Sequence, residues 1–451
     1  MVEIEQTPAE VAWGAQTQLA ITNFPISGRP VDPRLIRALA RIKAAAGTVN
    51  GALAEVTVVD AAMGRVIAEV ANEIAHGAYL DQFPVDVFQT GSGTSTNMNM
   101  NEVVATFASQ RLGRAVHPND HVNASQSSND VIPSAIRIAA AGGVVDELVP
   151  VLERLTRVLR RKSREFATVV KAGRTHLMDA TPITLGAEFG AYATQIELNI
   201  ERLRECIPRV CMLPLGGTAV GTGINAPRQF APRVVRRLAN STSLPLRAVR
   251  DRVARQAAQD ELVELSSHLR TLAMSLVKIA NDVRWMASGP HSGLDEIALP
   301  ALQAGSSIMP GKVNPVLCEV VTQVAVQVFG NDASVAFAGS QGSFELNTYL
   351  PVIAHNVLES ITLLTNATRE FTERCVSGIV AHEEVCRDYA ERSPAIAAAL
   401  NERLGYDRVA EAVHEAERHG VTVREIVRER GWLSARELDA LLDVQRLASP
   451  Q

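Results

Sequence analysis

Aromatic side chains are scarce in this chain of 451 residues, and a positive net charge is missing. Aromatics make up 4% of the sequence, so no platform for stacking nucleotide bases accompanies the basic run at 154–165. The arginines of that run fall at helical spacing beside leucines, which is typical of a solvated helix face. The formal net charge of −5 gives no general attraction to nucleic acid or to anionic lipid. We therefore expect neither nucleic acid nor membrane as a partner.

Cysteines are also few, and long apolar runs are absent. The sequence has five cysteines, an odd number without Cys-x-x-Cys spacing, which favours reduced thiols over a disulfide framework or a zinc site. No apolar run reaches the roughly 18 residues of a membrane-spanning helix. The N-terminus does not resemble a signal peptide. Together these features predict a cytoplasmic protein.

What is present is the composition of a globular protein, with 47% hydrophobic and 21% charged residues. A prior of about 150 residues per domain suggests about three domains. The polar and helical stretches place them at 1–125, 126–382 and 383–451. We expect the long helices in the central domain and a small helical cap at the C-terminal end.

The strongest pattern is a stripe of apolar residues between Asp251 and Ser288, a span of 38 residues without glycine or proline. Its members alternate at spacings of three and four: Leu262, Leu265, Leu269, Leu272, Leu276, Ile279, Val283 and Met286. Such a heptad stripe predicts one helix roughly 55 Å long at about 1.5 Å per residue, packed in a bundle. Similar stripes follow in 134–168, 183–205 and 316–328. The fold is therefore predicted to be all-α, or mainly helical, with a long central helix bundle. Its apolar stripes need partners, so we expect oligomerisation through the bundle.

Four polar stretches interrupt this pattern. They are "TGSGTSTNMNMNE" (90–102), "HPNDHVNASQSSND" (117–130), "AGRTHLMDATP" (172–182) and "GSSIMPGKVNP" (305–315). Each by itself is typical of a turn or a helix cap. Taken together they supply serine, threonine, asparagine, lysine and histidine, which are donors suited to anionic oxygens. The set predicts a pocket for a small, flat, doubly anionic molecule such as a dicarboxylate.

Two other kinds of site are excluded by the same stretches. His117, Asp120 and His121 could suggest metal ligands, but Pro118 interrupts them and no companion set of ligands is present. The glycines of "LGGTAVGTG" (215–223) lack the strand–helix context of a nucleotide-binding loop. We therefore expect no metal and no nucleotide cofactor.

The polar stretches resemble the signature blocks of class II fumarases in the fumarase/aspartase superfamily, as does "LPLGGTAVGTGINAP" (213–227). The resemblance runs from about Trp13 to beyond Leu433. It implies a three-domain fold and a homotetramer with a twenty-helix core, in which three subunits build each active site. It also implies the reversible hydration of fumarate to L-malate, a reaction of the tricarboxylic acid cycle, without a cofactor.

The resemblance also implies roles for individual residues. Ser306 is the expected general base that removes the carbon-bound proton, and Ser307 is the local alternative. His176, paired with Glu319 of another subunit, would handle the proton of the leaving hydroxyl. Removing the carbon-bound proton creates extra charge on a carboxylate, which Lys312 and Asn314 are suited to bind. The remaining expected substrate-binding residues are Ser92, Thr94, Ser127, Ser128, Asn129 and Thr175. A second anion site is expected at Arg114, His117, Asn119 and Asp120.

Two alternatives remain open. The stretch 299–307 resembles aspartate ammonia-lyases, which share the fold and expel ammonia, but these typically have threonine within the block that reads "QSSND" in this chain. A non-catalytic helical scaffold of the same fold would be expected to have lost a residue such as Ser306 or His176, and neither is lost. The chain departs from the fumarase pattern at Leu19 and His291, where arginine is frequent, and both positions bear on contacts at the site entrance.

Overall fold

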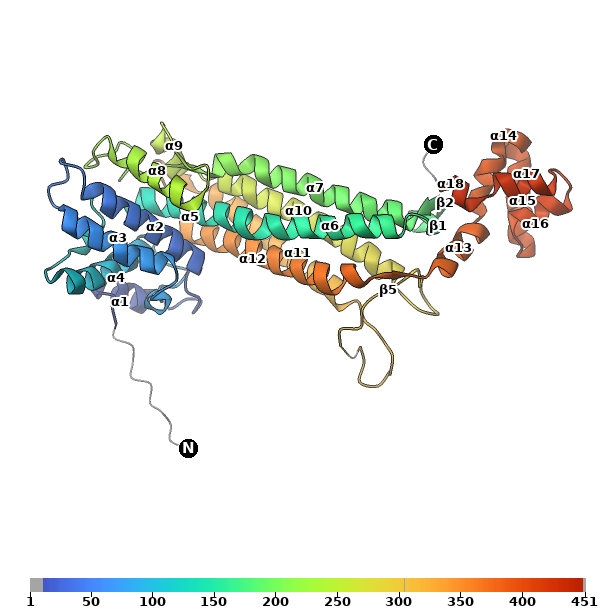
Figure 1. Ribbon diagram of the computed structural model, residues 1–451, viewed down its shortest axis with the longest axis horizontal. Helices are drawn as coiled ribbons and strands as arrows, with labels where there is room; N and C mark the ends of the chain where they lie inside the picture. The colour runs from blue at the N-terminus through green and yellow to red at the C-terminus, as the bar shows by residue number, and fades with distance from the viewer. Residues whose placement is uncertain (1–10, 304, 449–451) are drawn as a thin grey trace. The chain divides into compact units, whose positions relative to one another are not determined.

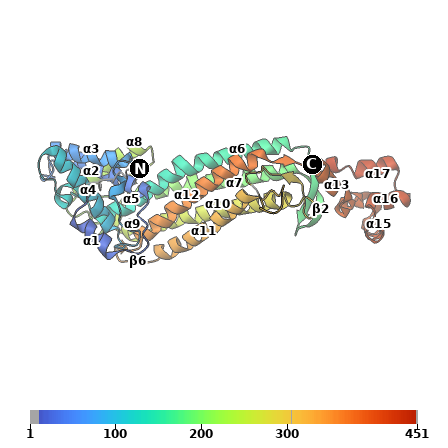
Figure 2. The ribbon, with the colours of Figure 1, turned by 90° about the horizontal axis from the view of Figure 1, so that it is seen from below.

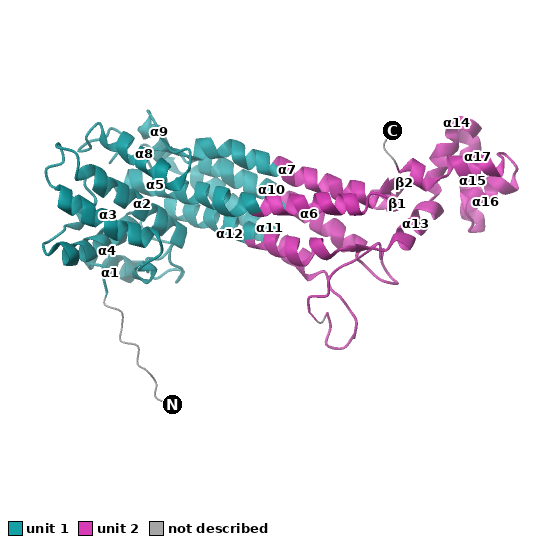
Figure 3. Cartoon of the chain, viewed as in Figure 1, with its two compact units in different colours: residues 1–150, 199–273, 324–365 teal, residues 151–198, 274–323, 366–451 magenta. Residues whose placement is uncertain are grey.

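The structure is a computed structural model that describes residues 11–303 and 305–448 (Figure 1). Residue 304 lies outside the described residues and belongs to the stretch that resembles aspartate ammonia-lyases. The N-terminal residues on which the signal-peptide prediction rests also lie outside them. Helices dominate and the strands are short, which confirms the prediction of a mainly helical fold. The chain divides into two compact units (Figure 3). Unit 1 comprises 1–150, 199–273 and 324–365, and unit 2 comprises 151–198, 274–323 and 366–451. The division into three domains stays a prediction.

Unit 1 begins with short helices that pack around α2. Its elements are α1 Ala15–Asn23, α2 Pro33–Asn50, α3 Ala61–Ala75, η1 Leu80–Gln82, α4 Thr94–Leu112, η2 Pro118–Val122, α5 Ser128–Gly142, η3 Gly143–Leu148, β3 Met212–Leu213, α8 Phe230–Thr242, β4 Arg247–Ala248, α9 Arg252–Ala257, β6 Gly342–Ser343 and β7 Leu346–Asn347. Helix α2 packs against α3, α5 and α8 (Figure 1). Its start is fixed by Asp32, which accepts a hydrogen bond from the Arg34 N–H, and by Pro33 in the first turn.

Helices α2 and α3 approach closely because two glycines face each other. A Cβ added at Gly64 would lie 2.5 Å from the Gly47 carbonyl oxygen, so larger residues would push the helices apart. Asp60 caps α3 by accepting from the Ala62 and Met63 N–H groups.

Unit 2 holds the one larger hairpin and the C-terminal helices among the described residues. Its elements are α6 Val149–Glu165 (from residue 151), β1 Val170–Thr175, β2 Met178–Thr184, β5 Ile297–Ala298, η4 Val376–Gly378, β8 Val380–Ala381, α13 Glu383–Arg392, η5 Pro394–Leu400, α14 Asn401–Leu404, α15 Tyr406–His419, α16 Val423–Glu429, α17 Ala435–Leu441 and α18 Val444–Leu447. Strands β1 and β2 pair antiparallel, and β5 pairs with β8. Helix α6 lies beside the first half of α7 (Figure 2), where Arg160 bonds Glu197 and the Ser163 hydroxyl donates to the Gly186 carbonyl at 2.7 Å.

Four long helices contribute residues to both units: α7 Leu185–Val210, α10 Asp260–Met286, α11 Val316–Gly339 and α12 Leu350–Arg374. Every member of the heptad stripe on α10 is buried, from Leu262 to Met286. The stripes predicted in 183–205 and 316–328 also lie in helices, α7 and α11. The sequence therefore identified three of these four long helices, whereas α12 was not predicted and α11 continues past residue 328 to Gly339.

The single helix expected from Asp251 to Ser288 is wrong at its N-terminal end. Helix α9 ends at Ala257, and α10 begins at Asp260. The break is stabilised by tertiary hydrogen bonds of two buried glutamines. The Gln256 side-chain amide donates to the Thr218 carbonyl at 2.8 Å, and the Gln259 side chain accepts from Arg137 at 3.2 Å. The residues around the break include no glycine or proline, so no local pattern indicated it.

Two of the predicted polar interruptions are regular structure. Most of 90–102 belongs to α4, whose asparagines are buried and bonded: the Asn99 side chain donates to the Gln82 carbonyl at 3.0 Å. Glu102 accepts hydrogen bonds from the N–H groups of Gly14, Gln16 and Thr17. The stretch 172–182 is the β1–β2 hairpin. The polar residues of both stretches therefore lie in regular structure, although their composition is typical of loops.

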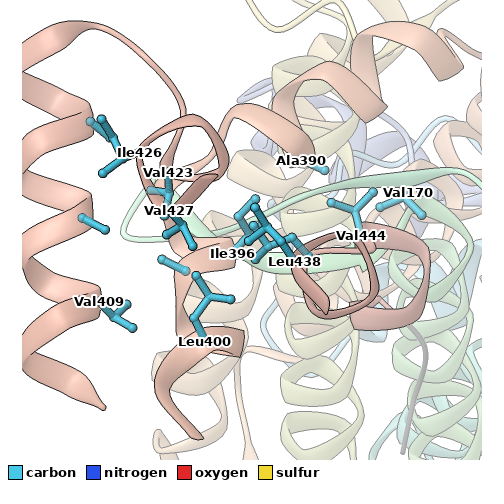
Figure 4. Close-up of a cluster of buried hydrophobic side chains, with 14 residues drawn as sticks. Val170, Ala390, Ile396, Leu400, Val409, Val423, Ile426, Val427, Leu438 and Val444 are labelled. Atoms are coloured by element: carbon cyan, nitrogen blue, oxygen red, sulfur yellow. The ribbon is translucent and has the colours of Figure 1, made fainter. Parts of the chain in front are cut away.

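The C-terminal helices share a small buried core, to which Val170 of strand β1 also contributes. Figure 4 shows Ile396, Leu400, Val427 and Leu438 pointing toward one another from η5, α16 and α17. Two of its short helices start with reciprocal caps, Thr422 with Glu425 and Ser434 with Glu437. Such capping boxes satisfy donors that short helices would otherwise leave open.

The five cysteines are buried, and none of them is in a disulfide: Cys206, Cys211, Cys318, Cys375 and Cys386. Burial raises the pKa of Cys206 and Cys211 to about 12, so these thiols are protonated near neutral pH. Within 11–303 and 305–448, no helix combines the length and the apolar character needed to span a membrane.

Candidate active site

In unit 1, polar residues gather where two helices begin. Helix α4 starts after Gly93, whose φ of 72° lies in the left-handed region. The hydroxyls of Ser92 and Thr94 are 2.7 Å apart on either side of it. A Cβ at Gly93 would lie 2.8 Å from the Ile132 side chain of α5, so the starts of α4 and α5 are in close contact. Free N–H groups and the helix dipole make such ends favourable for anions.

The start of α5 carries three of the expected substrate-binding residues. The Ser127 hydroxyl accepts from the Asn129 N–H at 3.2 Å, and the Asp130 carboxylate accepts from the Ser127 N–H at 2.9 Å. This reciprocal pair is a capping box, which fixes the turn that contains Ser128. Sequence reasoning missed Asp130, although the Ser-x-x-Asp spacing could have indicated it.

The expected second anion site is assembled only in part. The His117 ring nitrogen Nδ1 accepts from the N–H groups of Asn119 and Asp120, at 3.3 and 3.1 Å. These three residues therefore share one exposed turn at the start of η2. Arg114 instead pairs with Asp60, and its hydrogen bond lowers the pKa of that carboxyl group. An anion at this turn would have to compete with Asp60 for Arg114, and the role of the four residues stays a prediction.

In unit 2, Thr175 and His176 lie at the tip of the β1–β2 hairpin. His176 and Leu177 form its two-residue turn with φ values of 55° and 62°. Positive φ at both turn positions is the type I′ geometry, which residues other than glycine, asparagine and aspartate rarely adopt. The side chains of both turn residues are exposed. The hairpin thus presents the histidine outward at a strained position, which is common for functional residues.

A buried ion network holds this hairpin in place. Glu296, which is fully buried, contacts Lys171 at 3.0 Å and Arg174 at 2.8 Å. Lys171 also contacts Glu188 at 2.9 Å, and burial raises the pKa of Glu188 although Lys171 opposes that shift. Glu296 immediately precedes β5, which leads into the loop 305–315. Sequence reasoning missed Glu296, since only the fold brings it to strand β1.

The loop 305–315 carries the expected base. The Ser306 oxygen Oγ accepts from the N–H groups of Ile308 at 3.2 Å and Met309 at 3.1 Å. The Asn314 side chain donates to the Gly305 carbonyl at 2.8 Å and so closes the neck of the loop. A Cβ at Gly305 would lie 2.0 Å from the Lys312 carbonyl oxygen, so only glycine fits there. Donors aimed at a serine oxygen stabilise its deprotonated form.

Lys312 and Asn314 border a cleft of about 810 Å³ within unit 2. Arg284, Trp285 and His382 line the same cleft. Ser306 and Lys312 also line a second cavity of about 390 Å³. Lys312 is exposed and lines both cavities, so its charge is available to a dicarboxylate in either one.

The expected residues therefore form two groups. Unit 1 brings together Ser92, Thr94, Ser127, Ser128 and Asn129 near two helix starts. Unit 2 brings Ser306, Lys312 and Asn314 into one loop, with Glu319 in the first turn of α11 that follows it. The pairing of His176 with Glu319 was expected between subunits and stays a prediction. Among the described residues, no group of three or more histidine, cysteine, aspartate or glutamate side chains is arranged to hold a metal ion.

Comparison with known proteins agrees with the sequence blocks. The chain matches the family described as Lyase over residues 4–330 and the family described as Fumarase C C-terminus over residues 396–449. It is 52% identical to the class II fumarate hydratase of Mycobacterium tuberculosis, covering 99% of this chain and 94% of that protein. It is 51% identical to the class II fumarate hydratase of Corynebacterium glutamicum, covering 98% and 94%.

Solved structures give the same result. A recombinant class II fumarase from Schistosoma mansoni superimposes with a TM-score of 0.95 at 35% identity, covering 99% of this chain and 97% of that one. A fumarate lyase:delta crystallin from Brucella melitensis bound to cobalt gives a TM-score of 0.94 at 44% identity, covering 98% and 97%. With its sequence blocks, helical fold and loop 305–315, the chain is a lyase and belongs to the class II fumarate hydratases of the fumarase/aspartase superfamily.

Proposed function

We propose that the protein catalyses the reversible hydration of fumarate to L-malate, as a hydro-lyase of the tricarboxylic acid cycle. One observation carries the proposal beyond family membership: Ser306 Oγ accepts two backbone N–H donors in the loop that also presents Lys312 and Asn314. Elimination of water from malate needs a base for a weakly acidic carbon-bound proton and donors for the resulting charge. This loop supplies both within ten residues of chain.

Ser306 acts as the base in this mechanism. A serine hydroxyl is a weak base, so it functions only if its alkoxide is stabilised. The N–H groups of Ile308 and Met309 provide this stabilisation, and the nearby Lys312 adds positive charge. The proton leaves the carbon next to a carboxylate, and Lys312 with Asn314 binds the extra negative charge that develops there.

The remaining residues bind the carboxylates and the leaving group. The starts of α4 and α5 offer hydroxyl, amide and N–H donors to a carboxylate through Ser92, Thr94, Ser127, Ser128 and Asn129. Thr175 contributes a further hydroxyl from the hairpin. His176, oriented by Glu319 of another subunit, donates a proton to the departing hydroxyl. A carboxylate partner fixes the tautomer of an imidazole and raises its fraction of the protonated form.

We further propose a homotetramer with a twenty-helix core, in which three subunits build each site. Two observations support it. The hairpin tip exposes Leu177 and Met178 beside His176, with 68% and 70% of these side chains accessible in the single chain. Helix α11 exposes Val326 and Phe337, at 70% and 64%. In the proposed tetramer these apolar side chains would be covered by neighbouring subunits, which supports the proposal.

Subunit hybrids test the shared site. Chains with His176→Asn and chains with Ser306→Ala should each be nearly inactive as homotetramers. After the two are mixed and reassembled, some sites receive an intact histidine and an intact serine from different chains, so activity should return. A monomeric mass in light scattering together with full activity would refute the shared site.

A cytoplasmic location, without a metal or an organic cofactor for catalysis, completes the proposal. The five free thiols fit a reducing compartment. The direct test of function is the ultraviolet absorbance of fumarate, followed with malate and then with aspartate as substrate in the absence of added metal. We expect fumarate to form from malate only. Activity with aspartate alone would assign an aspartate ammonia-lyase, and no activity with either would favour a scaffold.

A further inference from the structure

The glycine loop 215–223 has no role in the mechanism above, yet it lies against the start of α5. The N–H groups of Gly216 and Thr218 donate to Asp130 Oδ2, at 2.7 and 3.1 Å. The other oxygen of the same carboxylate, Oδ1, accepts from the Ser127 N–H at 2.9 Å. The Asn129 side chain donates to the Ala219 carbonyl at 2.8 Å. One carboxylate therefore joins the substrate-binding turn to the glycine loop.

This loop can adopt its path only with glycine. Gly216 has a φ of 87°, and a Cβ added there would lie 2.5 Å from the Ala231 side chain. A Cβ at Gly217 would lie 2.1 Å from the Gln256 side-chain oxygen. The Gln256 amide in turn donates to the Thr218 carbonyl. The backbone of the glycine loop is therefore in close contact with Gln256 of α9 and is hydrogen-bonded to Asp130.

Asp130 and Lys43, whose positive charge acts on Asp130, are both buried, at 0% exposure. The Lys43 amine donates to Asn123 at 2.9 Å and to Gln126 at 3.1 Å, in the segment that leads into Ser127. Burial lowers the pKa of Lys43 to about 7, against the attraction of Asp130. Burial raises the pKa of Asp130, against its three N–H donors and Lys43. Burial therefore disfavours the charged form of both groups, and a buried pair of ionisable groups is a poor source of stability compared with apolar residues of similar volume.

We propose that Asp130 is a positioning residue for the binding of a dicarboxylate. Its carboxylate clamps the Ser127–Asn129 turn to the glycine loop 215–223, and Lys43 holds the segment before the turn through Asn123 and Gln126. The clamp fixes the direction of the donors that receive a substrate carboxylate. Asp130 does not touch the substrate in this role, and it acts through Ser127 and Asn129. The inference rests on the proposed function, because it assigns the turn to carboxylate binding.

Asp130→Asn tests the clamp with almost no change of shape. Whichever way the new amide points, its NH₂ group faces an N–H donor, so one side of the clamp is lost. Because the turn binds substrate and transition state alike, we expect KM for malate to rise about tenfold and kcat to change less than about threefold. The inhibition constant of succinate, an unreactive dicarboxylate, should rise in parallel with KM.

Asp86→Asn is the matched control. Asp86 is another buried carboxylate of unit 1 that accepts backbone N–H bonds, from Ser27, Gly28 and Phe88, in a segment without a proposed site residue. It should lower stability as Asp130→Asn does and leave KM unchanged. Should Asp130→Asn fail to fold, Gln256→Leu loosens the glycine loop from its other side and should raise KM about threefold.

The outcomes separate the two claims. A wild-type protein that does not convert malate overturns the proposed function. A wild-type protein that does, combined with folded Asp130→Asn whose KM and succinate inhibition constant are unchanged, overturns the clamp alone. Equal increases of KM in Asp130→Asn and Asp86→Asn also overturn it, since the effect would then be general loosening of the unit.

Discussion

The two regions proposed to bind substrate differ in how they are built. The turn Ser127–Asn129 lies at the start of helix α5. It is held by a hydrogen bond from the Ser127 N–H to Asp130, which is fully buried. The loop 305–315 has no regular structure, exposes Ile308 with 82% of its side chain accessible, and is held mainly at its neck. Both regions offer donors to anionic oxygens, but only the first is anchored by a buried charge.

This difference indicates separate roles for the two regions: the turn recognises a substrate carboxylate, and the loop carries out the chemistry. A carboxylate that is present in substrate, transition state and product is suited to a rigid set of donors. The base and the donors for the developing charge must be shielded from water during the reaction and then release the product, which a loop with a glycine neck permits. We therefore expect substitutions in the loop to lower kcat, and substitution of Asp130, which holds the turn, to raise KM.

The largest effect is expected for Ser306→Ala. Removal of the base should lower kcat by a factor on the order of 10³, with KM within about threefold of wild type, because the base acts only in the transition state. Steady-state kinetics with malate measures both values. Ser307→Ala is the neighbouring control and should retain activity. An inactive Ser307→Ala beside an active Ser306→Ala would move the base by one residue.

Lys312→Ala should have the next largest effect. It is the expected exception to the division between a binding turn and a catalytic loop, because this lysine serves both binding and turnover. Its charge faces a substrate carboxylate in the ground state and the extra charge in the transition state. We expect kcat/KM to fall by a factor on the order of 10², with a lower kcat and a higher KM. Lys312→Arg keeps the charge and should recover part of the loss. A change in KM alone would show that Lys312 only binds.

Gly305→Ala tests the neck of the loop. The added methyl group would collide with the Lys312 carbonyl, so the loop must shift and Ser306 with it. We expect kcat to fall about tenfold, because small displacements of a reacting group are costly, while the melting temperature stays close to wild type. Gly142→Ala is the control, since that glycine is helical and its added methyl would meet only the Asp146 carboxylate at 3.8 Å. Equal kinetics for both variants would mean that the neck does not position the base.

The smallest kinetic effect is expected for Asp86→Asn, which should change stability alone. Burial raises the pKa of Asp86, but hydrogen bonds from Phe88, Ser27 and Gly28 outweigh burial and hold the pKa below its usual value. The native state thus favours the carboxylate, and its contribution is present above the unfolded pKa of about 4 and is lost as pH falls through the lower folded pKa.

Denaturant unfolding at several pH values measures this contribution. At pH 7 the variant should be less stable by about 1–3 kcal/mol. The difference from wild type should shrink as the pH is lowered below about 4. A difference that grows on acidification would mean that the folded pKa of Asp86 is raised.

The long helices α7, α10 and α11 were predictable from the sequence alone, and the residues proposed to bear the chemistry were found from its motifs. The stripe from Leu262 to Met286 is a local repeat, and periodicity alone predicts a buried helix face. Ser306, Lys312 and Asn314 are close in sequence, so their motif was readable without a structure. The capping box at Ser127 was also within reach, because it spans only three residues.

The pairing of polar residues that lie far apart in the chain was not predictable without the fold. Glu296 with Lys171, Asp130 with Gly216, and Gln256 with Thr218 are joined over long separations that no local pattern encodes. The bond between Gln256 and Thr218 lies at the break between α9 and α10, and Asn99 of α4 likewise finds its partner at a distance, the Gln82 carbonyl. The physical reason is that a buried polar group must find a hydrogen-bonding partner, and where that partner lies is a property of the folded chain.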